Sequence, residues 1–337
     1  MNISLDKKII IFGTGELAKK ITEELQTENF KISYYIDNKE EKQDRFFLNR
    51  PINNPNFLLD EDKSCLFIII ASMYYEEISK QLESMGFESD KHFKEYFEFI
   101  YGGKNYFCPF CKGSFNHFLP KGWETRVAKE KQIIGSGYRE NVVCPRCQSY
   151  DRERLILLYL QEETNVFNDN YNILHIAPEK NLEKALKALN ISGYLTADLS
   201  SDKVMQKMDI TDIQYNDNYF DVIICNHVLE HIPNDKKALK ELYRVLNLKG
   251  FAILQVPISQ TLNETYEDSN ITNYEERLEK FGQGDHVRIY GKDYIQRLEA
   301  AGFKVDLYDY RTKHGLDLFE KYRLLDDEIL YICRKIM

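Results

Sequence analysis

Phe220-Asp221-Val222-Ile223-Ile224-Cys225-Asn226-His227 is the stretch that decides the fold of this chain. Its apolar run is typical of a strand buried on both faces of a parallel sheet, and the run ends in polar residues. Similar short runs end at Ile176, Asp198 and Val256, and segments with helical periodicity separate them. Strands that alternate with helices predict an α/β fold built on a parallel sheet.

Polar side chains stand at the ends of these predicted strands, where open α/β sheets bind their ligands. Asp198, followed by Leu199, is placed to hold ribose hydroxyls, and Asp209 is placed to accept from the exocyclic amine of an adenine. Met208 and Ile210 are expected to stack on or flank that ring. For any single polar residue the alternative is a strand-end cap, but consecutive strand ends all carry a fitting residue type.

The segment Phe220–Pro233, followed by Leu239–Gly250 with Glu241, Arg244 and Lys249 inside it, resembles the class I methyltransferases that act on small molecules. The resemblance spans residues 172–257. It implies S-adenosylmethionine as the methyl donor, with Asn226 and His227 facing its methionine portion. It also implies a seven-stranded sheet with one antiparallel strand, closed by a hairpin of residues 303–308 with 329–333.

The first motif departs from that family, whose glycine-rich turn is replaced here by His175-Ile176-Ala177-Pro178-Glu179. Ala177 is small enough for a close approach of the cofactor, whereas Pro178 removes an N–H and stiffens the turn. We therefore expect cofactor contacts to shift to His175 or Glu179, and Glu179 is suited to the cofactor's ammonium group.

Asp285-His286-Val287-Arg288-Ile289-Tyr290-Gly291 is the segment expected to lie over the sulfonium and to meet the methyl acceptor. A hydroxyl acceptor needs a base, and histidines titrate in the right range, so His286 and His231 are the candidates. Arg288 is a candidate clamp for a phosphate or carboxylate on the acceptor. The alternative is that these side chains only tie the segment to the core.

Two Cys-Pro-x-Cys knuckles predict a metal site formed by four thiolates, Cys108, Cys111, Cys144 and Cys147. Such a set suits Zn²⁺ and leaves no open coordination position, so the zinc would be structural. A redox Cys-x-x-Cys pair would come once, at the start of a helix, and an iron–sulfur cluster remains an alternative. His117 is an alternative ligand, but we favour its interpretation as an exposed loop histidine.

Basic residues are scattered around the knuckles, and Trp123, the only tryptophan, lies between them. They would either contact RNA or a phosphorylated substrate, or form a solvated face. We favour the solvated face because Glu124, Glu130, Glu140 and Glu153 interleave with them. The basic residues are Lys129, Lys131, Arg139, Arg146, Arg152 and Arg154.

The first hundred residues predict a small Rossmann-like domain. A strand at Lys8–Phe12 runs into Gly13-Thr14-Gly15, a helix follows, and a second strand ends in Asp37. Such a turn binds a nucleotide or nucleotide-sugar through Gly13, Gly15 and Asp37, or serves packing alone. The stretch resembles Rossmann-like modules attached to enzymes of bacterial surface-polysaccharide assembly, which implies a glycan-related context.

The chain thus divides into residues 1–100, a zinc ribbon at 101–152 and a methyltransferase domain at 153–337. With 337 residues and a net charge of −9, nucleic acid is a disfavoured partner. No export signal or membrane span is visible, so we expect a cytoplasmic protein. The leading hypothesis is O-methylation of a sugar, nucleotide-sugar or other glycan precursor. RNA methylation and a cofactor-binding scaffold without turnover are the alternatives, and the oligomeric state is open.

Overall fold

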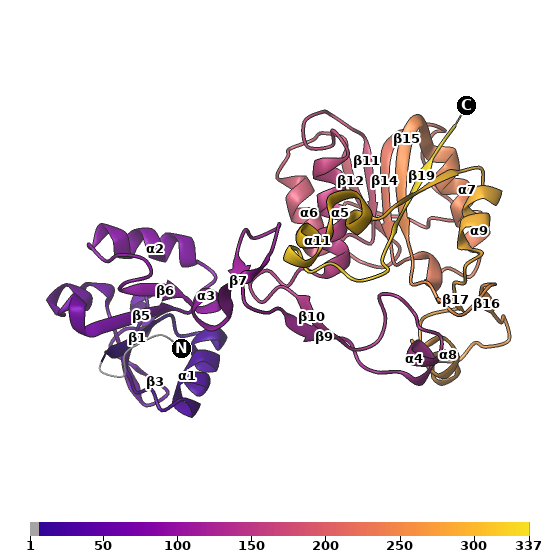
Figure 1. Ribbon diagram of the computed structural model, residues 1–337. Helices are drawn as coiled ribbons and strands as arrows, with labels where there is room; N and C mark the ends of the chain where they lie inside the picture. Colours follow the sequence, from indigo (N-terminus) through magenta and orange to yellow (C-terminus); the bar gives the residue numbers. More distant parts are fainter. Residues whose placement is uncertain (1–6, 337) are drawn as a thin grey trace. The chain divides into compact units, whose positions relative to one another are not determined.

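The computed structural model describes residues 7–336, so the polar start of the chain, residues 1–6, lies outside the described part (Figure 1). The chain forms two compact units. The first contains the residues up to Lys104 together with Gly113–Asn116, and the second contains Asn105–Lys112 together with His117 onward. Within residues 7–336, no helix is both long enough and apolar enough to cross a bilayer.

The first unit is built on a six-stranded sheet in the order β3-β4-β2-β1-β5-β6. All neighbouring strands are parallel except β3, which pairs antiparallel with β4. Apolar side chains of α1 and α3 pack on one face of the sheet and those of α2 on the other. The elements are β1 (Lys8–Phe12), α1 (Glu16–Thr27), β2 (Ile32–Ile36), β3 (Phe46–Phe47), β4 (Arg50–Asn53), β5 (Leu66–Ile70), α2 (Tyr75–Ser84), β6 (Phe93–Glu95) and α3 (Tyr96–Tyr101).

The second unit is built on a seven-stranded sheet in the order β13-β12-β11-β14-β15-β19-β18. Only β19 runs antiparallel to its neighbours, as expected from the sequence. The predicted closing hairpin is also present. The strands are β11 (Ile173–Ile176), β12 (Tyr194–Asp198), β13 (Gln206–Lys207), β14 (Phe220–Asn226), β15 (Leu246–Gln255), β18 (Lys304–Tyr308) and β19 (Leu330–Arg334).

Helices cover both faces of this sheet, which gives the α/β fold its three layers (Figure 1). One face packs against α5, α6 and α11, and the other against α7 and α9. The strands at the centre of the sheet are apolar on both sides because each side meets a helix layer. The helices are α5 (Asp151–Glu162), α6 (Lys180–Lys187), α7 (Asp235–Val245), α9 (Tyr294–Ala300), α10 (Tyr310–His314) and α11 (Leu316–Lys321).

Short elements from two distant segments complete the second unit. The cysteine-rich segment contributes β9 (Leu119–Lys121), α4 (Arg126–Glu130) and β10 (Arg139–Val143). Two strands precede them in the chain, β7 (Gly102–Phe107) and β8 (Ser114–Phe115), and β8 belongs to the first unit. The segment after β15 contributes β16 (Tyr266–Glu267), α8 (Tyr274–Phe281) and β17 (Arg288–Ile289). Helices α4 and α8 pack against each other, so the two segments form one layer.

Arg154 on α5 is fully buried and joins three parts of the second unit. Its Nη1 donates to the carbonyls of Val142 and Ser149 at 3.0 and 2.8 Å, which lie on either side of the second knuckle. Its Nε and Nη2 donate to the carbonyls of Tyr322 and Arg323 at 2.8 and 2.7 Å, which follow α11. The expectation of a solvated basic face is therefore wrong for this residue.

Replacing Arg154 with methionine should lower the free energy of unfolding by about 3 kcal/mol or more, because buried carbonyls would lose their donor. Urea denaturation followed by circular dichroism measures this change. The matched control is Arg126→Met, whose side chain is 88% exposed and pairs with Glu130. The control should change the unfolding free energy by less than about 0.5 kcal/mol. Equal effects of the two substitutions would contradict the role of Arg154.

Candidate functional site

Three polar side chains meet where β11 and β14 end. His175 Nε2 lies 3.0 Å from Glu179 Oε2, and Asn226 Nδ2 donates to the other carboxylate oxygen. The other ring nitrogen of His175 lies 2.9 Å from the hydroxyl of Tyr194. Burial alone would raise the pKa of Glu179, but His175 outweighs it and the pKa is lowered. Glu179 is therefore a charged carboxylate at the predicted ligand edge of the sheet.

The turn after β11 has the backbone conformation that a glycine motif would supply. Ala177 has φ of 45°, in the left-handed region, and its N–H donates to the carbonyl of Ala197 at 2.8 Å. A non-glycine residue in this region carries about 1 kcal/mol or more of strain. His227, directly after β14, is also left-handed with φ of 54°. Both residues bend the chain away from the sheet at the ligand edge.

Asp198 ends β12, and its hydrogen bonds within residues 7–336 all go to one carboxylate oxygen, Oδ1. Its Oδ1 accepts from the backbone N–H groups of Ser200 and Ser201 at 2.8 and 2.7 Å. Burial alone would raise the pKa of Asp198. The hydrogen bonds from Ser200 and Ser201 stabilise its charged form more strongly, so the pKa is lowered overall. An ionised carboxylate with a free oxygen at a strand end is the group that a ribose diol needs.

The residues expected around an adenine ring are divided between surface and core. Met208 and Ile210 are buried in the hydrophobic core, whereas Asp209 between them is exposed. The side chain of Leu199 is 64% exposed, so it offers apolar surface next to Asp198. Of the three apolar candidates, only Leu199 has surface free to lie against a ring.

Several buried polar atoms beside these residues have no hydrogen-bond partner within residues 7–336. They include Asn226 Oδ1, His227 Nε2 and Glu230 Oε2. An unpaired buried polar atom costs about 1–3 kcal/mol, so a native structure normally pairs it with a ligand or water. Glu230 was not among the residues singled out from the sequence, although it stands directly before His231.

Buried carboxylates gather around the same strand ends. Burial raises the pKa of Glu153 to about 8, and the nearby charge of Glu179 adds to the effect. Burial likewise raises the pKa of Glu328 to about 7, with Asp151 adding to it. The expectation that Glu153 belongs to a solvated face is wrong, because it is 3% exposed. A bound ligand with positive charges would favour the ionised form of both carboxyl groups, and S-adenosylmethionine carries a sulfonium and an ammonium.

The two histidines proposed as bases lie together. The rings of His231 and His286 meet edge to face at 4.7 Å, and their nitrogens lie within 4.8 Å of a Glu230 oxygen. His231 Nδ1 is 3.3 Å from Asp285 Oδ2. Burial lowers the pKa of His286 to about 4, so its imidazole is neutral at physiological pH.

Arg288, two residues after His286, is buried and its guanidinium is held by the protein itself. It donates to the carbonyls of Leu229, Ile232 and Pro233 at 2.6–2.9 Å and to Glu267 at 3.0 Å. The side chain is 2% exposed. This geometry favours the interpretation in which Arg288 ties its segment to the core over the one in which it clamps an acceptor.

A loop between the two cysteine knuckles closes over the strand ends. Ile134 N–H donates to the carbonyl of Ile258 at 2.9 Å, which anchors the loop on the segment after β15. A Cβ on Gly135 would lie 3.6 Å from the His227 ring and 4.0 Å from Glu328. The cysteine-rich segment thus forms one wall of the candidate site, which the sequence did not reveal.

Comparison with protein-family models identifies this region. Residues 170–254, which contain His175, Asp198 and Asn226, match the model described as "Methyltransferase domain". This part of the chain is a methyltransferase domain. Its methyl donor is S-adenosylmethionine, and the buried carboxylates and unpaired acceptors fit that cofactor's charges. Residues 5–93 match a second model, described as "C2185-like, N-terminal".

Several solved structures are similar to part of this chain at low identity. An S-adenosylmethionine-dependent methyltransferase from Archaeoglobus fulgidus is 16% identical with a TM-score of 0.35, over 54% of this chain and 94% of that one. One from Mesorhizobium loti is 11% identical with a TM-score of 0.35, over 49% and 91%. The [4+2]-cyclase SpnF is 14% identical with a TM-score of 0.38, over 55% and 82%. A search among curated proteins finds no similar sequence.

The four predicted thiolates converge next to the methyltransferase domain. Their sulfurs all lie within 4.8 Å of one another, with Cys108–Cys147 at 3.5 Å and Cys111–Cys144 at 3.6 Å. Sulfurs bound tetrahedrally to zinc at about 2.3 Å stand about 3.8 Å apart, so the set fits the ion. His117 is exposed and is not part of the group.

The two knuckles have the same backbone geometry. Lys112 N–H donates to the Cys108 carbonyl and Gln148 N–H to the Cys144 carbonyl, both at 2.9 Å. Lys112 and Gln148 are both left-handed, with φ of 57° and 62°. The repeated sequence pattern therefore produces a repeated turn, which directs two pairs of sulfurs at one point.

The first unit contains its own cavity, of about 550 Å³, at the predicted glycine turn. Asp37 is buried there and accepts from Thr14 at 2.5 Å and Lys42 at 3.1 Å. A Cβ on Gly13 would stand 2.5 Å from the Ala71 carbonyl, so Gly13 serves packing. A Cβ on Gly15 would meet nothing within 4 Å, so this glycine faces open space.

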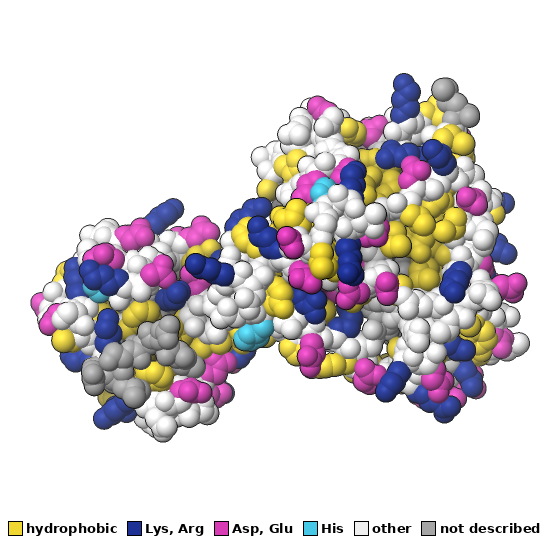
Figure 2. Space-filling view, in the orientation of Figure 1, with side chains coloured by type: hydrophobic (Ala, Val, Ile, Leu, Met, Phe, Trp, Pro, Cys, Tyr) yellow, Lys and Arg dark blue, Asp and Glu magenta, His cyan; other side chains and the backbone are white. Residues whose placement is uncertain are grey.

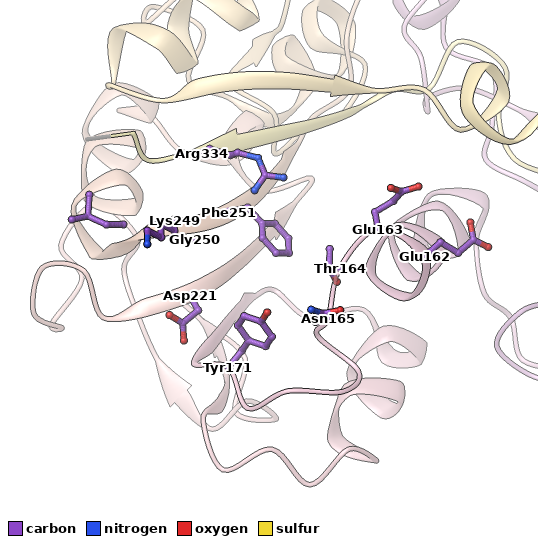
Figure 3. Close-up of a pocket in the computed structure, with 11 residues that line it drawn as sticks. Glu162, Glu163, Thr164, Asn165, Tyr171, Asp221, Lys249, Gly250, Phe251 and Arg334 are labelled. Carbon is purple, nitrogen blue, oxygen red and sulfur yellow. The ribbon is translucent and has the colours of Figure 1, made fainter.

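A further cavity of about 550 Å³ lies at the opposite edge of the methyltransferase sheet, where β14 and the apolar part of β15 begin (Figure 3). Glu163, Asp221 and Arg334 line it. Because the predicted site residues lie at the other ends of these strands, this cavity is separate from the candidate site.

Replacing Cys144 with serine should remove the metal and loosen the loop that covers the strand ends. We expect about one zinc ion per chain in the native protein by plasma mass spectrometry, and substantially less in the variant. The melting temperature should fall with it. Cys65→Ser is the matched control, because Cys65 is an exposed cysteine outside the cluster. Unchanged zinc content in Cys144→Ser would contradict the site.

Proposed function

We propose that this chain transfers a methyl group from S-adenosylmethionine to an oxygen of a sugar, nucleotide-sugar or other glycan precursor. The main support is the pairing of two features at one edge of the methyltransferase sheet. One is the acidic cluster of Glu179, Glu230 and their neighbours, which is complementary to the cofactor. The other is the neutral imidazole of His286, which suits an acceptor that must lose a proton.

The cofactor is assigned to the strand ends. Asp198 holds the ribose through its free oxygen, Leu199 lies against the adenine, and Asp209 accepts from the adenine's amine. Asn226 Oδ1 and Glu230 Oε2 are unpaired acceptors in the described residues, and they suit the ammonium and the positively charged sulfonium. Glu179 supports them by orienting Asn226. S-adenosylmethionine supplies an electrophilic methyl group when bound.

An acceptor hydroxyl that takes up this methyl group would lose its proton to a base. His286 is the proposed base, and Glu230, His231, Asp285 and His227 are the titratable groups around it. His231 is the second candidate, since it is more exposed and next to His286. Holding the acceptor in line with the sulfonium supplies much of the acceleration.

The N-terminal unit is proposed to bind a nucleotide or nucleotide-sugar. The carboxylate of Asp37 lies beside the open space at Gly15, at the start of α1. This arrangement suits a ribose and a phosphate group. A unit that binds the nucleotide part of a glycan precursor fits an O-methyltransferase of such precursors.

Replacing Asp198 with alanine should weaken S-adenosylmethionine binding about 10- to 100-fold, because a charged hydrogen bond to the ribose contributes about 1.5–3 kcal/mol. Isothermal titration calorimetry measures the affinity. Asp202→Ala is the matched control, since this carboxylate is 88% exposed and pairs only with Lys207. If the affinity of Asp198→Ala equals that of the native chain, the assigned ribose site is wrong.

The His286 imidazole should titrate with a midpoint near pH 4, because burial disfavours its charged form. The base would then stay neutral and competent as the pH falls from 8 to about 5, and kcat/KM would decline only below that. NMR of the histidine ring protons, assigned with His286→Gln, measures the midpoint. A midpoint near the ordinary histidine value of about 6.5 contradicts the prediction.

A further inference from the structure

A small cavity of about 210 Å³ opens where the cysteine-rich segment meets the segment after β15. Three cationic side chains line it, Lys121, Arg139 and Arg152, and no carboxylate does. This separation of charge is unusual in a chain of net charge −9, on whose visible surface acidic and basic side chains are interspersed (Figure 2). A cavity whose charged lining residues are all cationic is suited to an anion.

Two of these cations have donors that the protein leaves unused. The Nε atoms of Arg139 and Arg152 are buried, and neither has a hydrogen-bond partner in the described residues. Each guanidinium is therefore only partly compensated within the protein, and an anion in the cavity would offset part of the cost of burying its charge. Arg139 also contacts Asp151, which fixes its position.

Aromatic rings and bare backbone complete the cavity. Tyr150 lies under both Lys121 and Arg152, each 5.6 Å from the ring centroid. Trp123 is 62% exposed at the cavity. Gly137 also lines it and leaves room against the backbone, because a Cβ there would meet nothing closer than Ala128 at 4.0 Å. Exposed aromatic rings beside guanidinium groups are suited to a ring that carries an anionic group.

The cavity borders the proposed cofactor site. Gly135 lines it and also lies against the His227 ring, where a Cβ would be 3.6 Å away. Gln283 lines it as well, and its carbonyl accepts from the N–H of His286 at 3.3 Å. A molecule anchored here would therefore reach toward the sulfonium and the proposed base.

We propose that this cavity binds the phosphate group of a small phosphorylated methyl acceptor, with Arg152 and Arg139 as its ligands and Trp123 against its ring. This inference rests on the proposed methyl transfer and adds the acceptor's chemical class. An RNA strand shares the phosphate chemistry, but the small cavity and the acidic chain favour a free small molecule.

Trp123 is the only tryptophan, so its fluorescence reports directly on the cavity. The full chain, with saturating S-adenosylmethionine, is titrated with inorganic pyrophosphate and with uridine diphosphate. We expect a saturable fluorescence change with either probe. Arg152→Gln should weaken the binding of each at least about tenfold, while S-adenosylmethionine affinity measured by calorimetry stays within about twofold.

Lys129→Gln is the matched control, because Lys129 is an exposed cation of the same segment that does not line the cavity. It should leave probe binding unchanged. The proposal is overturned if no saturable change occurs, if Arg152→Gln weakens S-adenosylmethionine instead of the probes, or if an RNA oligonucleotide binds more tightly than uridine diphosphate with a steep salt dependence. The dependence of cofactor binding on Asp198 is measured separately in the chain with Arg152 intact, so failure here is distinct from failure of the proposed methyl transfer.

Discussion

The buried guanidinium of Arg154 is the interaction on which the second unit depends. It joins the two sides of the second knuckle to the residues after α11 through four hydrogen bonds to backbone carbonyls. Burial lowers the pKa of this group, but Asp151 and the nearby thiols of Cys108, Cys144 and Cys147 oppose that effect. Four thiolates around Zn²⁺ would carry a net negative charge, which complements the arginine. The cysteine-rich segment is therefore held on the methyltransferase domain by both hydrogen bonds and charge.

This attachment gives the zinc site a role in the architecture of the catalytic region. A closed set of four thiolates has no position for substrate, so its contribution is to fix the chain between the knuckles. That chain supplies the loop at Gly135, which lies over His227, and the cations Arg139 and Arg152. A metal bound there would stabilise this wall of the candidate site, and the wall brings the basic cavity next to the proposed cofactor site.

Opposite charges on neighbouring walls suit the two molecules that methyl transfer brings together. Glu179 and Glu230 lie toward the proposed cofactor, whose sulfonium and ammonium are positive. Lys121, Arg139 and Arg152 lie toward the proposed phosphorylated acceptor. Electrostatic interactions are stronger in a poorly hydrated site than in water. This separation of charge would therefore position both molecules before the reaction. In the proposed reaction, the neutral imidazole of His286 would take the proton of an acceptor hydroxyl.

The sequence by itself determined the sheet and the four thiolates, since apolar runs and repeated knuckles are local patterns. It also indicated Asp198, Asn226 and His227, because strand ends can be read from where an apolar run stops. Only the tertiary structure showed the burial and the neighbours of Glu230, Arg152 and Arg154, because those neighbours come from distant segments. Burial too depends on distant segments. From the sequence, Arg154 and Glu153 are predicted on a solvated face, but both are buried in the folded chain. Met208 and Ile210 are likewise buried in the core and not at the ligand site. The sequence could not show this, because neither alternation nor spacing indicates which side of a short segment after a strand faces the core.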